Sequence, residues 1–188
     1  MKLISCTIEN FGKLNNVTYD FSGECNTICE DNGWGKSTLA SFIRVMFYGF
    51  KNESKKKLVD KERNRLMPWQ KGVYGGEIVF ETGGVVYSLR RTFGKKQVDD
   101  EFLLVRKDTN VECDDFSCDI GEELFKIDAQ SFERTVFIGQ SDCVTATTDS
   151  INAKIGNLAD NTDDINNFET AVGRLTAVLN NITSTRST

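Results

Sequence analysis

The sequence contains, at residues 30–38, the stretch Glu30-Asp31-Asn32-Gly33-Trp34-Gly35-Lys36-Ser37-Thr38. Its end fits the phosphate-binding pattern G-x-x-x-x-G-K-[ST], in which a glycine, a lysine and a hydroxyl residue follow one another. Glu30 stands where the pattern has its first glycine, so a strict pattern search misses the stretch. Whether it is a phosphate loop therefore depends on whether its residues can perform the chemistry of one.

The residues of this loop suit a nucleoside triphosphate. Gly33 and Gly35 let successive backbone N–H groups turn toward an anion and leave no side chain in its way. Lys36 is expected to reach the β- and γ-phosphates, the Ser37 hydroxyl to ligate Mg²⁺, and Thr38 to donate to the α-phosphate. We therefore expect ATP and Mg²⁺ to bind through Asn32, Gly33, Trp34, Gly35, Lys36, Ser37 and Thr38.

The residues on either side of the loop predict a strand before it and a helix after it. Residues 25–29 are expected to form a short strand, and a helix is expected to start near Lys36, where its amides and positive dipole end favour an anion. Gly49 is the expected end of this helix. Glu30 lies at the far end of the loop, so its carboxylate is expected to face away from the phosphates. One buried face is predicted by residues at helical spacing: Leu39, Phe42, Ile43, Met46 and Phe47.

The rest of the head region predicts strands and short helices. The glycine turn Thr82-Gly83-Gly84 predicts a hairpin between the strands that flank it. The fold class we expect is α/β, a P-loop NTPase lobe with a mixed sheet around the loop and helix and a separate antiparallel layer. The predicted strands are Lys2–Glu9, Val17–Phe21, Gly76–Glu81, Val85–Arg91 and Phe102–Arg106, and the predicted short helices are Glu122–Phe125 and Ala129–Phe137.

Residues 51–71 form a basic block that shows no sustained period and contains the only proline, Pro68. We expect an exposed, poorly ordered loop with one helical turn. With Trp69 and Tyr74 nearby, the block can contact a nucleic-acid backbone without sequence preference. A solvated basic loop without a partner is the other interpretation of the same composition.

The C-terminal region shows apolar residues spaced alternately by three and four, which is the seam of a coiled coil. We expect a head lobe at 1–158, the root of a coiled-coil arm at 160–182 and a tail at 183–188. An amphipathic helix packed on the domain would show the same spacing. The seam residues are Ile165, Phe168, Val172, Leu175, Leu179 and Ile182.

Composition excludes several kinds of protein. The chain has 188 residues, 39% of them hydrophobic and 27% charged, which is typical of a globular domain. No apolar run approaches the roughly 20 residues of a membrane helix, and the start does not resemble a secretory signal, so a cytoplasmic location without a membrane partner is expected. Histidine is absent, which rules out a His-based triad, and the six cysteines form no C-x-x-C pair.

Three segments together resemble a known superfamily: Met1-Lys2-Leu3, Ile8-Glu9-Asn10-Phe11-Gly12-Lys13, and the loop that ends in Thr38. They are similar to the N-terminal ATPase lobe of SMC-like proteins, above all the SbcC-type double-strand-break-repair ATPases and their YhaN-like bacterial relatives. In that family the first strand ends in Asn-Phe, and a phosphate loop, strands, a glutamine loop and a coiled-coil arm follow. The present chain has this order from residue 1 to about residue 182.

The resemblance implies further site residues. Gln140, in Val136-Phe137-Ile138-Gly139-Gln140, matches the glutamine loop, whose amide oxygen approaches Mg²⁺ and the attacking water. Lys36 and Gln140 would then be the catalytic residues, and Ser37 and Gln140 the ligands of the metal. Lys13 stands where the family often places a basic residue near the nucleotide.

The resemblance also implies a function and its partners. It implies an ATPase, associated with the nucleoid, that acts in DNA repair or DNA processing. The expected partners are the C-terminal lobe of the same head, a second copy in a homodimer closed around ATP, DNA and an SbcD-type nuclease.

The sequence lacks a signature motif and a strand that ends in the Asp-Glu pair of Walker B, so hydrolysis is expected to require the C-terminal lobe. Two other functions stay open. One is a self-contained small-molecule phosphotransferase, which needs a parallel five-stranded core and a lid with arginines. The other is a nucleotide-binding module without catalysis.

Overall fold

The computed structural model describes residues 1–21, 23, 25–51, 61–138, 151–152 and 176. The chain divides into two units, Met1–Asp142 and Cys143–Thr188, and all the elements named below belong to the first. Three predictions fall outside the described residues: the loop at 52–60, Gln140, and the coiled-coil arm except for residue 176.

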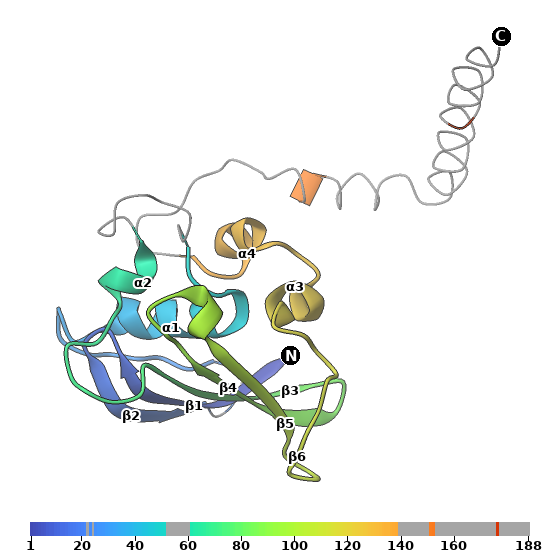
Figure 1. Cartoon of the computed structure of the whole chain (residues 1–188), viewed down its shortest axis with the longest axis horizontal. Helices are drawn as coiled ribbons and strands as arrows, with labels where there is room; N and C mark the ends of the chain where they lie inside the picture. The colour runs from blue at the N-terminus through green and yellow to red at the C-terminus, as the bar shows by residue number, and fades with distance from the viewer. Residues whose placement is uncertain (22, 24, 52–60, 139–150, 153–175, 177–188) are drawn as a thin grey trace. The chain divides into compact units, whose positions relative to one another are not determined.

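A single six-stranded sheet forms the framework of the first unit (Figure 1). Its strand order is β2-β1-β3-β4-β5-β6, and every pair of neighbours is antiparallel. The predicted glycine hairpin is confirmed, because β3 and β4 pair along their whole length and Gly83 and Gly84 have φ angles of 59° and 80° in the turn. The strands are β1 (Lys2–Phe11), β2 (Leu14–Asp20), β3 (Gly75–Thr82), β4 (Val85–Thr92), β5 (Glu101–Arg106) and β6 (Val111–Glu112).

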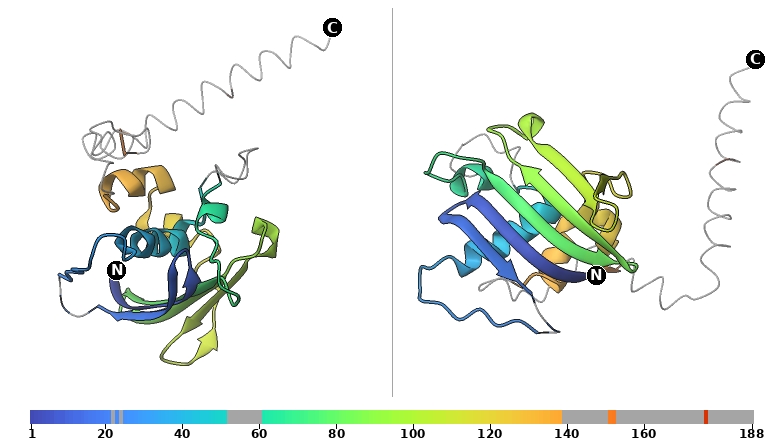
Figure 2. Two further views of the ribbon diagram at one scale, coloured as in Figure 1. Left: turned by 90° about the vertical axis from the view of Figure 1, so that its left-hand side faces the viewer. Right: turned by 90° about the horizontal axis from the view of Figure 1, so that it is seen from below.

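Helices cover one face of this sheet, with α1 lying across it, as Figure 2 shows. The helical pattern after the loop is confirmed: Leu39, Phe42, Met46 and Phe47 are buried, and Gly49 caps the C-terminus of α1. The helices are α1 (Lys36–Tyr48), α2 (Glu62–Arg65), α3 (Ile120–Phe125) and α4 (Ala129–Thr135), with a 3-10 turn η2 (Gln97–Asp99).

Aromatic residues dominate the core between α1 and the sheet. The rings of Phe42 and Phe11 meet edge to face with centroids 5.2 Å apart, and those of Phe47 and Phe80 do so at 5.7 Å. Such pairs stabilise by about 0.5–1.5 kcal/mol beyond the burial of their area. A Cβ atom at Gly76 would lie 3.0 Å from Phe42 Cζ, so a glycine in β3 lets α1 approach the sheet closely.

The predicted mixed sheet with a separate antiparallel layer is wrong for the described residues. The strands assigned to those two layers form one antiparallel sheet. The predicted strand at residues 25–29 is also absent from it, and most of that segment is exposed. A strand needs a partner for its N–H and C=O groups, and no strand of the described sheet pairs with this segment.

The basic block also differs from its predicted exposure at α2, whose Glu62 and Arg63 are buried. Glu62 pairs with Arg44 of α1, and Arg63 makes a two-bond contact with Asp100 at 2.7 and 2.8 Å. Buried charges are found where they are paired, and composition alone does not reveal the partner. None of the described helices is long and apolar enough to cross a membrane.

Candidate functional site

Two glycines with positive φ shape the loop that precedes α1. Gly33 has φ 83° and Gly35 has φ 125°, both in the region that side-chain-bearing residues rarely adopt. A Cβ atom at Gly33 would meet nothing within 4 Å, so that glycine is required by its backbone angle and leaves open space above the loop. The Trp34 N–H donates to the Asp31 carbonyl at 3.2 Å and closes the turn between them.

The loop leads directly into the N-terminus of α1, a helix of 13 residues. Its N-cap residue is Gly35, and within the described part of the chain no side chain caps the helix and no acidic residue lies in its first turn. The first amides of a helix lack intrahelical acceptors, and the dipole places partial positive charge there. This helix end is therefore suited to an anion such as a phosphate.

The Lys36 side chain folds back over the loop. Its Nζ donates to the carbonyl of Glu30 at 2.6 Å and to that of Asp31 at 3.1 Å. An ammonium has three donors, so these two bonds leave a third for a phosphate oxygen. These two bonds hold the lysine against the loop and place its ammonium group next to the loop backbone.

Glu30 stands where the phosphate-loop pattern has glycine, and only its main-chain carbonyl accepts the hydrogen bond from Lys36. A glycine at this position would provide the same carbonyl, so the substitution keeps this contact. The Glu30 side chain is exposed. The pKa of Tyr19 on β2 is raised, first by burial and then by the negative charge of Glu30. The Tyr19 ring also contacts the Trp34 ring edge to face, with centroids 5.9 Å apart.

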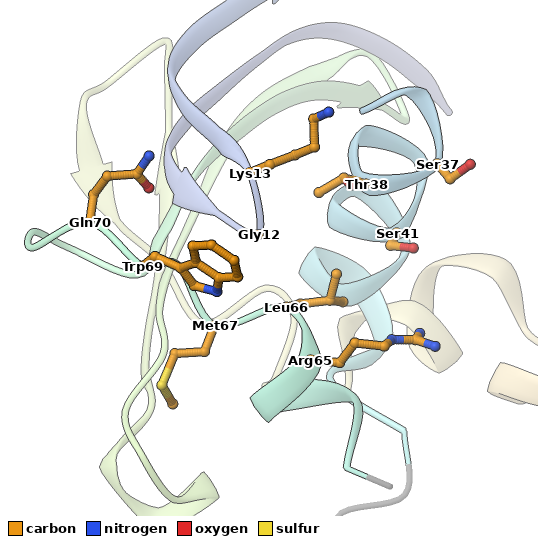
Figure 3. A pocket seen from close by; sticks show the side chains of 10 residues that line it. All are labelled: Gly12, Lys13, Ser37, Thr38, Ser41, Arg65, Leu66, Met67, Trp69 and Gln70. Carbon is orange, nitrogen blue, oxygen red and sulfur yellow. The ribbon is translucent and has the colours of Figure 1, made fainter. Parts of the chain in front are cut away.

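A cavity of about 580 Å³ lies beside the start of α1 (Figure 3). One wall comes from the β1–β2 turn and from α1: Gly12, Lys13, Ser37, Thr38 and Ser41. The other wall comes from the end of α2 and the segment after it: Arg65, Leu66, Met67, Trp69 and Gln70. Ligand pockets typically have volumes of about 300–1,000 Å³, so this cavity has room for a nucleotide.

The Gly12 turn holds the two walls together. A Cβ atom at Gly12 would lie 2.9 Å from Thr38 Cγ2, so the turn can approach α1 this closely only as glycine. The Gly12 N–H donates to the Leu66 carbonyl at 2.7 Å, which ties the turn to the opposite wall. The same turn places Lys13 beside the loop, with its Cε 3.4 Å from the position of a Cβ atom on Gly35.

The structure thus brings Lys13, Ser37 and Thr38 to one cavity, next to the loop formed by Asn32, Gly33, Trp34, Gly35 and Lys36. Gln140 lies outside the described residues. The sequence does not predict the second wall and indicates Trp69 only as a possible nucleic-acid contact. Its signal was the run Met67-Pro68-Trp69, apolar residues inside a basic block.

The side chains near the cavity that could bind a metal ion suit Mg²⁺ that is held mainly by the phosphates of a nucleotide. In the described ranges no group of three or more Asp, Glu, Cys or His side chains can hold a metal ion, whereas the Ser37 hydroxyl is exposed at the cavity. Mg²⁺ usually keeps several waters and binds through substrate phosphates and one or two protein ligands. The residues present are compatible with that mode, and the bound ion would shield the phosphate charges.

Comparison with known proteins identifies the family. The sequence profile described as "AAA domain" matches residues 5–185. The chain belongs to this family. The match gives the chain the P-loop NTPase fold of an AAA-type domain, a fold that binds ATP.

A more specific likeness is to the protein named uncharacterized protein YhaN of Bacillus subtilis. The two are 35% identical over 82 residues, which is 43% of this chain and 8% of that protein. The chain thus aligns with less than a tenth of its relative. Together with the family match, this likeness confirms the resemblance to a lobe of an SMC-like P-loop ATPase.

Proposed function

We propose that the chain is the ATP-binding N-terminal half of an SMC- or SbcC-like ATPase head that acts in DNA repair or DNA processing. The observation that carries this proposal is the shared cavity, in which the start of the phosphate-loop helix meets the basic β1–β2 turn. Ser37 and Thr38 come from the helix, and Lys13 comes from the turn. Both a cation and hydroxyl donors therefore face the same space.

In the proposed complex the loop amides and Lys36 hold the β- and γ-phosphates, and Ser37 holds Mg²⁺. Lys13 adds positive charge beside Gly35, where the chain of phosphates would pass. Each of these groups neutralises charge on the triphosphate. Binding and orientation are what this lobe contributes.

Hydrolysis needs further groups. None of the ten residues that line the cavity is acidic, so the cavity wall offers no general base for the attacking water. Phosphoryl transfer requires a positioned water and additional charge compensation. We propose that Gln140 orients this water, that the C-terminal lobe supplies the base, and that a second head closes over the nucleotide.

The structure makes the phosphotransferase alternative less attractive. Such enzymes need a parallel core, whereas all strand pairs among the described residues are antiparallel. A long antiparallel sheet beside the phosphate loop instead suits half of a larger head. The remaining alternative, a module that binds nucleotide without hydrolysing it, is distinguished by experiment.

Binding is tested with Lys36→Ala, and with Lys107→Ala as a matched control. Lys107 is an exposed lysine that pairs with Glu77 at 3.3 Å and follows β5, near the opposite edge of the sheet. We expect calorimetry to show MgATP binding in the wild type and in Lys107→Ala, and none in Lys36→Ala. Unchanged affinity in Lys36→Ala would place the nucleotide elsewhere.

The ATPase role is tested by measuring ATP turnover of the chain alone and mixed with a separately produced C-terminal lobe, with and without linear DNA. Turnover only in the mixture, stimulated by DNA, supports half of an SMC-like head. Turnover by the chain alone, indifferent to DNA, would identify a self-contained enzyme. Binding without turnover in any mixture would identify a non-catalytic module.

A further inference from the structure

Trp69 is the most exposed large apolar side chain among the described residues, with 99% of its surface accessible. Its indole nevertheless lines the cavity beside the phosphate loop, and Figure 3 shows it across the Gly12 turn from Thr38 and Ser37. An indole has one of the largest apolar surfaces of any side chain, and exposing all of it to water is unfavourable. The exposed indole is therefore suited to stack on a planar group of a ligand that enters the cavity.

The segment that carries Trp69 is anchored at both ends. At its start, the Leu66 carbonyl accepts the Gly12 N–H at 2.7 Å, and at its end the Val73 carbonyl accepts from Asn10 Nδ2 at 2.9 Å. Gly72 has φ 138°, and a Cβ atom there would lie 2.7 Å from that same Asn10 nitrogen. Both anchors lie at the end of β1, so the segment forms a short bridge with Trp69 in its middle.

The residue before Trp69 makes this bridge stiffer. Pro68 is the only proline of the chain, and its ring fixes its own φ angle and restricts the residue before it to extended conformations. Less conformational freedom is then lost when a ligand contacts the segment. The backbone that carries the exposed indole is thus restrained before any ligand arrives.

We propose that Trp69 stacks on the base of the bound nucleoside triphosphate. This inference rests on the proposed function and adds a base-binding subsite to it. Ser37 and Thr38 receive the phosphates at one wall, and the indole of the anchored segment stacks on the base at the other. Leu66 and Met67, which line the same wall, complete an apolar surface around the base.

Stacking of this kind tolerates different bases, because every base has a π-face. The lining residues on this wall that can donate hydrogen bonds from their side chains at the base edge are Arg65 and Gln70, together with the indole N–H of Trp69 itself. The Arg65 side chain is 70% exposed, so solvent weakens its contribution. We therefore expect MgATP and MgGTP to bind with affinities within about tenfold of each other, because the shared stacking provides most of the base-binding energy.

Tryptophan fluorescence provides the first test. The chain has two tryptophans, so Trp34→Phe leaves Trp69 as the single reporter. In that variant MgATP should quench the emission, whereas magnesium tripolyphosphate, which has the phosphates but no base, should not. Equal quenching by both, or by neither while MgATP still binds, would overturn the proposal.

Calorimetry with the full chain provides the second test and leaves the loop tryptophan in place. Removing a stacked aromatic side chain weakens binding by about fivefold to 150-fold, so Trp69→Leu should lose at least fivefold in MgATP affinity. Trp69→Phe, which keeps a ring, should stay within about threefold of the wild type. The affinity for magnesium tripolyphosphate should be the same in all three proteins.

The outcomes separate this proposal from the function on which it rests. If Lys36→Ala abolishes MgATP binding but Trp69→Leu leaves it unchanged, the phosphate site stands and the base subsite is wrong. If Trp69→Leu weakens the binding of single-stranded DNA and not that of MgATP, the indole serves nucleic acid instead. If the wild type binds neither MgATP nor magnesium tripolyphosphate, both proposals fail.

Discussion

The buried ion pair between Arg44 and Glu62 connects the phosphate-loop helix α1 to α2, whose end contributes to the second cavity wall. The two side chains are only 2% and 6% exposed. Besides its contact with Glu62, Arg44 donates to the Gly49 carbonyl at 3.0 Å and lies 3.4 Å from Glu133. Glu62 also accepts from the Lys51 amide at 2.8 Å. Arg44→Met would remove the buried guanidinium from Glu62 and leave the carboxylate only the exposed Arg65 guanidinium, 3.7 Å away, as an ion-pair partner.

The expected cost follows from this geometry. Breaking a buried pair by removing one partner destabilises a protein by about 3–5 kcal/mol, because an uncompensated charge stays inside. Domains are stable by about 5–15 kcal/mol in total, so the variant should lose a large part of its stability. The double variant Arg44→Met/Glu62→Leu removes both charges and should be more stable than Arg44→Met alone.

Urea denaturation followed by circular dichroism measures these free energies. Arg106→Met is the control, since Arg106 is 40% exposed and solvent screens its surface ion pair with Asp115, so this change should cost far less stability than Arg44→Met. The reasoning would be refuted if Arg44→Met cost less than its exposed counterpart, or if the double variant were no more stable than Arg44→Met.

Two further predictions concern the sheet. Gly76→Ala should lower the unfolding free energy by about 1–3 kcal/mol or more in urea denaturation, because the added Cβ would lie 2.2 Å from the Thr7 carbonyl oxygen and overpack the β1–β3 pair. Burial raises the pKa of the Cys6 thiol from 9.0 to about 12, so above pH 9 the unfolded chain releases a proton that the folded chain keeps. Stability should therefore fall between pH 9 and 12, by up to about 1.4 kcal/mol per pH unit, and Cys6→Ala should flatten that slope.

The sequence by itself determined the local features of the structure, namely the glycine turns and the buried face of one helix. The turn at Gly33 and Gly35 depends on backbone angles that glycine adopts without strain, and the buried face of α1 depends on helical spacing. The hairpin at Gly83 and Gly84 is equally local. These features involve residues that are close along the chain, so the pattern contains both partners of each interaction.

The tertiary structure alone decided which distant segments meet. Residues 25–29 have the composition of a strand, but strand pairing depends on partners elsewhere in the chain, and the described sheet includes none for them. Likewise, Glu62 is buried because Arg44 approaches it across 18 positions of sequence. The second cavity wall reaches the phosphate loop through the hydrogen bond from Gly12 to Leu66. Spacing along the chain cannot reveal such contacts, because their energy depends on a partner that only folding brings into reach.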